Sequence, residues 1–206
     1  MAEKRNHIKV FVASTVYSFE TQLEQIHEQL DGYGYDVLMS HKGTILLDSQ
    51  QSNLQNCIDG VEECDVFVGI IRPNYGSGVL DKGGKSITHY EFETAFKRNI
   101  PRFILADYRV AFTRSLFKDS FIIEDHTSKR IDFDNISFEN SSVMDTRCIR
   151  MCNESIKDKE RPASRRTGNW VQEYTNPYDI KTHLDGQFKY PARIQKLIDK
   201  SKQPHE

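Results

Sequence analysis

The most constraining feature of this sequence is a run of six residues without a polar side chain, Val66 to Ile71. Such a run is typical of a central strand in a parallel sheet, because helices cover both faces of that strand. Similar β-branched and aromatic runs occur from Ile8 to Ala13 and from Arg102 to Ala106. The sequence therefore predicts a sheet built on these three segments.

The segments between these strands have apolar residues at helical spacing. Helices are predicted over 17–30, 54–63 and 88–98, with a short further strand over 35–39. Strands and helices in alternation require right-handed crossovers, so the pattern predicts an α/β fold with a doubly wound parallel sheet. Ligands of such sheets bind at the carboxyl ends of the strands, where the strand order reverses.

The second half of the chain is less regular than the first. We predict a parallel α/β nucleotide-type domain over 1–118 and an α-rich extension over 119–206 that packs on the same domain. Within this half, the pattern predicts a helix over 110–117, a polar insertion over 119–142, a helix over 143–156, an exposed loop over 157–168, an edge strand over 169–172 and a closing helix around 194–198.

The composition excludes several classes of partner. The 206 residues carry a formal net charge of −2, which provides no general attraction to nucleic acid or to anionic lipid. No apolar run approaches the roughly 20 residues that a membrane span needs, and residues 1–7 lead into a strand without an export signal. We therefore expect a cytoplasmic protein without membrane or nucleic-acid partners.

The cysteines predict neither disulfide bonds nor a metal site. Cys57, Cys64, Cys148 and Cys152 form no C-x-x-C pair, so reduced thiols are expected. Cys148 and Cys152 are four residues apart, but no histidine stands at a spacing that would complete a zinc site.

The most informative segment runs from Ser86 to Pro101. A glycine-rich loop leads to Glu91 in the first turn of a predicted helix, and the small residue Ala95 lies one turn further on. Two interpretations stay open for Glu91. It forms a capping box with Thr88, or it places a carboxylate in a ligand cleft.

Further candidates for binding a ligand lie in the loops expected at the same edge of the sheet. Ser14 and Thr15 end the first strand, where they are equally compatible with capping the next helix. Glu93 and the arginines of 157–168 are expected to be solvated, and Trp170 to be a core anchor or a stacking platform. The predicted substrate-binding residues are Ser14, Thr15, Asn74, Tyr75, Gly76, Ser86, His89, Asp107 and Arg109.

Two resemblances to known families follow from these motifs. The order Glu91, Ala95, Pro101 and then an apolar strand is similar to nucleoside deoxyribosyltransferases and to Toll/interleukin-receptor (TIR) domains that cleave NAD. Most of the chain also resembles a family of unknown-function domains found with signalling NTPases in bacterial conflict systems. That second resemblance rests on residues 9–15, 34–37, 65–78, 86–101, 114–117 and 167–171.

These resemblances imply a flavodoxin-like fold and a function. Glu91 would be the catalytic residue of a nucleotide N-glycosidase, a TIR-like NAD hydrolase or cyclase in antiviral defence or signalling, without a cofactor or metal. Self-association or a partner signalling protein is expected from the same comparison. Two alternatives stay open: a non-enzymatic module that senses a nucleotide or binds a protein, and base exchange between nucleosides. A Glu91 locked in a helix cap would favour the first alternative.

Overall fold

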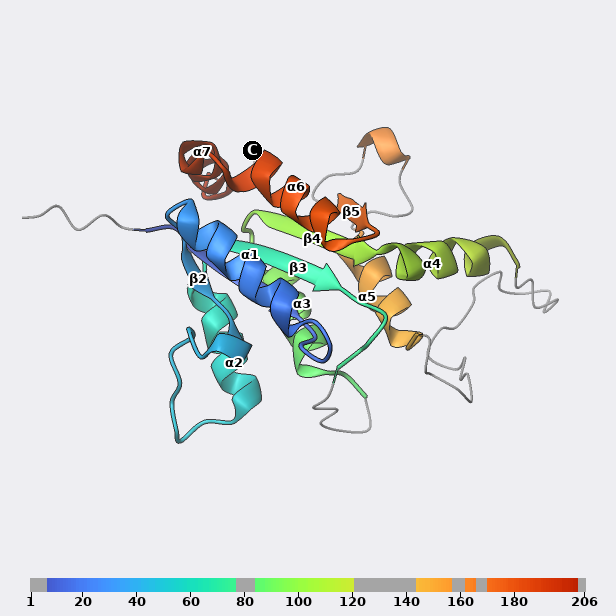
Figure 1. Ribbon diagram of the computed structural model, residues 1–206, viewed down its shortest axis with the longest axis horizontal. Helices are drawn as coiled ribbons and strands as arrows, with labels where there is room; N and C mark the ends of the chain where they lie inside the picture. Colours follow the sequence, from blue (N-terminus) through green and yellow to red (C-terminus); the bar gives the residue numbers. More distant parts are fainter. Residues whose placement is uncertain (1–6, 77–83, 121–143, 157–161, 166–169, 204–206) are drawn as a thin grey trace, which may run out of the picture.

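The computed structural model describes residues 7–76, 84–120, 144–156, 162–165 and 170–203. In this part of the chain, five parallel strands form one sheet in the order β2-β1-β3-β4-β5 (Figure 1). The strands are β1 (Lys9–Ser14), β2 (Asp36–Leu38), β3 (Val66–Ile71), β4 (Arg102–Asp107) and β5 (Val171–Tyr174). The doubly wound parallel sheet expected from the sequence is therefore confirmed.

The apolar run from Val66 to Ile71 lies at the centre of this sheet. All six residues of β3 are buried, and the strand pairs with β1 on one side and with β4 on the other. The strand order reverses between β1 and β3, because β2 lies on the far side of β1. In a doubly wound sheet, that reversal marks the place where a ligand crevice forms.

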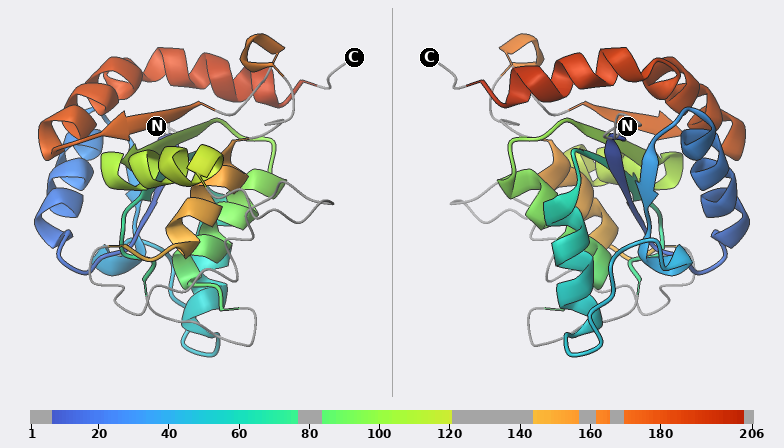
Figure 2. Two further views of the ribbon diagram at one scale, coloured as in Figure 1. Left: turned by 90° about the vertical axis from the view of Figure 1, so that its right-hand side faces the viewer. Right: turned by 90° about the vertical axis from the view of Figure 1, so that its left-hand side faces the viewer.

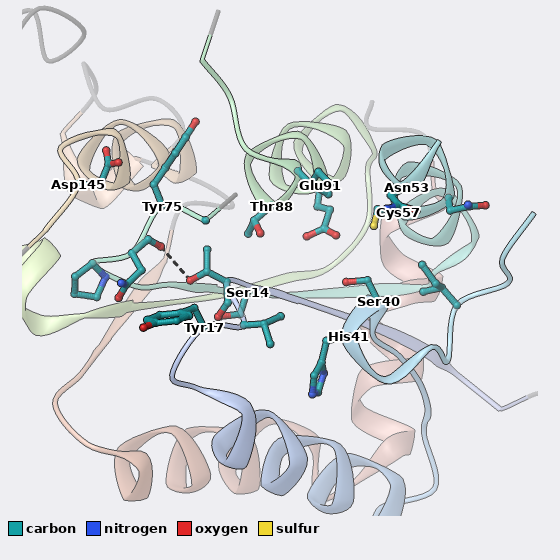
Figure 3. A pocket seen from close by; sticks show the side chains of 18 of the residues that line it. Ser14, Tyr17, Ser40, His41, Asn53, Cys57, Tyr75, Thr88, Glu91 and Asp145 are labelled. Atoms are coloured by element: carbon teal, nitrogen blue, oxygen red, sulfur yellow. Dashed lines mark hydrogen bonds between the residues drawn. The ribbon is translucent and has the colours of Figure 1, made fainter. Parts of the chain in front are cut away.

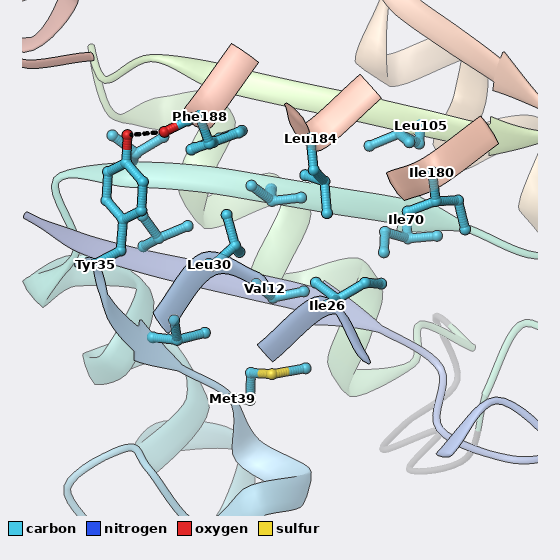
Figure 4. Packing of buried hydrophobic residues seen from close by; sticks show 14 of the residues in the cluster. Val12, Ile26, Leu30, Tyr35, Met39, Ile70, Leu105, Ile180, Leu184 and Phe188 are labelled. Atoms are coloured by element: carbon cyan, nitrogen blue, oxygen red, sulfur yellow. Dashed lines mark hydrogen bonds between the residues drawn. The ribbon is translucent and has the colours of Figure 1, made fainter. Parts of the chain in front are cut away.

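One face of the sheet is covered by α1 (Glu20–Gly32), α6 (Pro177–Phe188) and α7 (Pro191–Ser201), as Figure 2 shows. The apolar side chains of these helices pack on the alternate residues of β1 and β3 that point the same way (Figure 4). Tyr35 joins this layer and donates a hydrogen bond from its hydroxyl to the carbonyl oxygen of Phe188, 2.8 Å away. The end of α6 is thereby fixed on the first βαβ unit.

The opposite face carries α2 (Asn53–Glu63), α3 (Ile87–Lys97) and α5 (Arg147–Ser155). Phe67 on β3 meets Phe92 on α3 edge-on, with 5.3 Å between the ring centroids. Helix α4 (Tyr108–Ser120) continues from β4 and contacts α5. The helices of this face bring the second half of the chain next to the loops that follow β1 and β3.

Helix α6 is not among the helices predicted from the sequence, although its signals are present. Ile180, Leu184 and Phe188 recur every four residues, and Asn176 caps the helix in a capping box with Asp179. The predicted insertion over 119–142 lies almost entirely outside the described residues, and of the predicted loop over 157–168 only 162–165 are described. None of the described helices has the length and apolar character needed to cross a membrane.

Gly69 on β3 provides a test of this packing. A Cβ added at Gly69 would lie 2.5 Å from Cζ of Phe92 and 2.9 Å from Cδ1 of Ile104. Because both side chains are enclosed in the core, Gly69→Ala is expected to lower the free energy of unfolding by about 1–3 kcal/mol. Urea denaturation measures this change.

Gly186→Ala is the matched control for Gly69→Ala. Nothing lies within 4 Å of the Cβ position at Gly186, inside α6, so alanine there is expected to raise stability by up to about 1 kcal/mol. A Gly69→Ala protein as stable as the wild type would contradict the packing of α3 on β3.

Candidate active site

The loop between β1 and α1 is held in place by Arg72, the residue after β3. Its Nη1 donates to the carbonyl oxygens of Thr15, at 3.0 Å, and Tyr17, at 2.7 Å. The guanidinium also lies over the ring of Phe19, 4.4 Å from its centroid. Neither Ser14 nor Thr15 caps α1, because its N-cap is Phe19, which makes no side-chain cap bond. The side chains of Ser14 and Thr15 are therefore not used to start α1.

The loop after β3 contacts the loop after β1. The Thr15 hydroxyl donates to the carbonyl oxygen of Asn74 at 3.0 Å. Gly76 has a φ of +91°, and a Cβ there would lie only 2.7 Å from Cγ2 of Thr15. Glycine is thus required at Gly76 both by its backbone conformation and by the close approach of the two loops.

Tyr75 anchors this loop to α3 and α5. Its hydroxyl is hydrogen-bonded to Nδ1 of the fully buried His89, and the Nε2 of His89 lies 2.6 Å from Oε2 of Glu154. The guanidinium of Arg147 covers the Tyr75 ring at 4.3 Å. Burial raises the pKa of Tyr75 to about 12. Tyr75 therefore acts as a neutral wall residue with its hydroxyl engaged.

Helix α3 begins in a way that leaves Glu91 free. Its N-cap is Ser86, whose hydroxyl accepts a hydrogen bond from the backbone N–H of His89 at 3.3 Å. The capping-box interpretation of Thr88 and Glu91 is therefore wrong. Ser86 lies two residues before Thr88, and Glu91 falls in the second turn instead of reaching back to the helix start.

The Glu91 carboxyl points into an open cavity of about 790 Å³ (Figure 3). The cavity lies at the ends of β1 and β3, between α2 and α3. Glu91 itself is only 3% exposed, which places its carboxyl at the floor. Tyr17 and Leu47 line the cavity as well, and they are 76% and 61% exposed, so that they form an apolar rim.

Burial dominates the electrostatics of Glu91. Desolvation raises the pKa of its carboxyl to about 7, and hydrogen bonding with Cys57 acts in the opposite direction. Among the residues that the structure describes, no cation contributes to this pKa. A buried carboxyl of raised pKa that faces a cleft is a recurrent property of functional sites, because ordinary structural carboxylates are solvated or paired.

The structure brings together part of the predicted site. Ser14, Thr15, Asn74, Tyr75, Gly76 and Glu91 all line the cavity. Ser86 and His89 lie behind its wall and are fully buried. Asp107 and Arg109 lie elsewhere, at the end of β4, where they pair with each other at 2.8 Å. They were predicted to bind the ligand because they follow a strand, but β4 lies one strand away from the point of reversal.

The wall formed by α2 and η1 (Ser40–Lys42) was not predicted from the sequence. It supplies Ser40, His41, Asn53, Asn56 and Cys57 to the cavity. Asn56 also holds the preceding loop, since its Nδ2 donates to the carbonyl oxygen of Asp48 at 3.1 Å. The polar residues of α2 at Asn53, Asn56 and Cys57, at helical spacing, are the only sequence signal for this wall.

One cluster of side chains has the composition of a cation site. His89, Glu93 and Glu154 bring their ligand atoms within 4.8 Å of one another. Lys85 pairs with Glu93, and Arg150 lies 2.9 Å from Glu154, so both carboxylates already have a cationic partner. Although burial would raise the pKa of Glu154, hydrogen bonds with His89 and Arg150 lower it. The cluster is best described as a network that joins α3 to α5.

Fold and cavity together define a parallel α/β domain in which a buried glutamate of α3 faces a cavity at the ends of β1 and β3. The chain belongs to the family described as "Domain of unknown function (DUF4062)", which matches residues 9–189. A search of curated proteins finds no match to the chain. Among solved structures, a 2-deoxyribosyltransferase from Bacillus psychrosaccharolyticus is 19% identical, covers 48% of this chain and 72% of its own, and has a TM-score of 0.36.

The raised pKa of Glu91 predicts a pH-dependent cost in stability. The folded protein holds a proton on Glu91 up to about pH 7, whereas an unfolded glutamate loses it near its model value of 4.5. The protonated Glu91 side chain therefore stabilises the folded protein at low pH, and this contribution is lost as the pH rises from about 4.5 to 7. Over that pH range, the free energy of unfolding of Glu91→Gln should rise by about 3 kcal/mol relative to that of the wild type.

Urea denaturation at pH 4.5 and pH 8 measures this difference. Glu62→Gln removes an exposed carboxylate from the neighbouring helix α2 and serves as the control. If the difference between Glu91→Gln and wild type were the same at both pH values, the Glu91 carboxyl would not be desolvated in the folded protein.

Proposed function

We propose that this chain cleaves the N-glycosidic bond of a nucleotide, with NAD⁺ as its substrate and Glu91 as the catalytic carboxylate. The observation that carries the proposal is a buried carboxyl, without a cationic partner among the described residues, at the floor of an open cavity. Such a group favours a ligand that develops positive charge next to it. The transition state of N-glycosidic cleavage, with its oxocarbenium-like ribose, is of that kind.

The chemistry of NAD⁺ suits a cavity with one catalytic acid. When the bond between C1′ and the nicotinamide nitrogen breaks, its electron pair neutralises the pyridinium ring, so the leaving group needs no proton. The ionised Glu91 stabilises the ribosyl cation that remains. Water then adds to C1′ and gives up a proton to solvent, which yields ADP-ribose. Attack by a group of the same nucleotide in place of water would yield a cyclic product.

Residues of the cavity support a nucleotide as the ligand. The exposed ring of Tyr17 at the rim offers a flat surface for a base. Ser14 and Ser40 provide hydroxyl groups on either side of Glu91 for the ribose (Figure 3). A role in antiviral defence or signalling, together with self-association or a signalling partner, belongs to the same proposal and rests on the resemblance to TIR domains.

The non-enzymatic alternative, a module that senses a nucleotide or binds a protein, would be favoured by a Glu91 held in the helix cap. Ser86 makes that cap instead, so this observation does not support the alternative. Base exchange between nucleosides would use the same carboxylate, and the nature of the acceptor distinguishes it from hydrolysis.

Nicotinamide release from NAD⁺, followed by chromatography at high protein concentration, tests the proposal. The wild type is expected to turn over NAD⁺, and Glu91→Gln to lose at least about 100-fold in rate because the developing positive charge is no longer stabilised. Glu93→Gln removes the neighbouring carboxylate, which pairs with Lys85, and should keep the wild-type rate.

Circular dichroism and the urea midpoint establish that each variant is folded. Equal turnover by wild type and Glu91→Gln would remove Glu91 from the chemistry. Nicotinamide release only in the presence of an added free base, with that base bonded to C1′ of the product, would indicate base exchange. An inactive wild type on NAD⁺ and on a panel of nucleosides would refute the enzymatic proposal for the isolated chain.

A further inference from the structure

A cysteine lies beside the Glu91 carboxyl. Cys57 is in the second turn of α2, lines the same cavity as Glu91 and is 6% exposed. Figure 3 shows its sulfur next to the Glu91 side chain, with the Ser40 hydroxyl below the two groups. The Cys57 thiol interacts with Glu91, which raises the pKa of the thiol, and with Ser40, which lowers it. Side chains from η1, α2 and α3 thus meet beside the Glu91 carboxyl.

The thiol has the properties of a donor, and lacks those of a nucleophile. Burial, with Glu91 next to it, raises the pKa of Cys57 to about 12, so the sulfur keeps its proton at neutral pH. A protonated thiol donates a hydrogen bond, and an ionised carboxylate can only accept. Each hydrogen bond donated to a desolvated carboxyl group stabilises its ionised form.

The other titratable groups of the cavity face other partners, lie at its rim or, in His41, leave one ring nitrogen without a partner. Nε2 of His41 lies 3.6 Å from Oε1 of Glu24 and its buried Nδ1 has no hydrogen-bond partner among the described residues, whereas the Tyr75 hydroxyl is bonded to His89. Asp145 pairs with Arg147 at 2.6 Å, and Tyr17 is exposed at the rim. Among the described residues, Cys57 is the group whose interaction with Glu91 lowers the pKa of the Glu91 carboxyl.

We propose that Cys57 is a positioning residue for Glu91: its thiol donates to the ionised carboxylate and keeps that carboxylate aimed at the centre of the cavity. Cys57 does not attack the substrate and acts only through Glu91. This inference rests on the proposed function for its effect on rate, but its effect on the ionisation of Glu91 is independent of any activity.

A pair of variants of equal shape isolates the donor. Cys57→Thr keeps a donor at this position, and Cys57→Val replaces it with a methyl group. Carbon-13 NMR follows the titration of the Glu91 side-chain carboxyl, assigned by the loss of its signal in Glu91→Gln. We expect the carboxyl of the valine variant to titrate about one pH unit above that of the threonine variant.

The pH dependence of NAD⁺ turnover should shift in the same direction as the carboxyl titration. The midpoint of its pH profile is expected at higher pH in Cys57→Val than in Cys57→Thr, with similar rates well above both midpoints. Cys64→Ala is the control, since Cys64 is also buried at the end of α2 but its thiol donates to the carbonyl oxygen of Val61 at 3.1 Å. Cys64→Ala should titrate like the wild type.

The outcomes separate the two proposals. Identical carboxyl titrations in the valine and threonine variants overturn the role of Cys57, whatever the turnover. Displaced titrations without turnover in any protein refute the proposed function and leave the role of Cys57 standing. If the larger side chains disturb the fold, Cys57→Ser against Cys57→Ala repeats the comparison with smaller groups, and the same displacement is expected.

Discussion

The parallel pairing of β1 with β3 is the constraint on which the site depends. Their last paired residues are Ser14 and Ile70, so the two strands end at the same level of the sheet. The helix that follows β1 covers one face, whereas α3, which follows β3, covers the other. The loops must therefore separate, and the cavity lies between them. Arg72 and the bond from Thr15 to Asn74 hold both loops in place, so the opening does not collapse.

Glu91 turns this opening into a candidate active site, at a cost in stability. Its carboxyl is desolvated, and no described cation compensates it, so its ionised form is destabilised near neutral pH. An apolar or amide side chain would fill the position with less strain on the fold. Such a locally unfavourable arrangement is common where function determines the residue, because the compensating charge arrives with the ligand. Cys57 supplies a partial compensation, and the network of Tyr75, His89 and Glu154 keeps the opposite wall fixed.

Much of the fold could be predicted because the core strands are long, apolar and regularly spaced from amphipathic helices. The run from Val66 to Ile71 alone indicates a strand covered on both faces. The site was harder to predict, because residues join it through tertiary packing. Loop residues after β1 and β3 follow from topology, whereas Cys57 and Asn53 reach the cavity only because α2 packs beside α3. Asp107 and Arg109 show the converse: they stand at a strand end, yet the point of reversal lies one strand away.

The central claim is that the ribose of a nucleotide binds directly against Glu91. A crystal structure of Glu91→Gln with NAD⁺ tests this claim most directly, since the variant keeps the shape of the site and prevents turnover. We expect the nicotinamide ribose in contact with the side chain at position 91 and a base against Tyr17. The account would be contradicted if the nucleotide bound in another place, such as the groove between α1 and α6, and left the cavity at β1 and β3 unfilled.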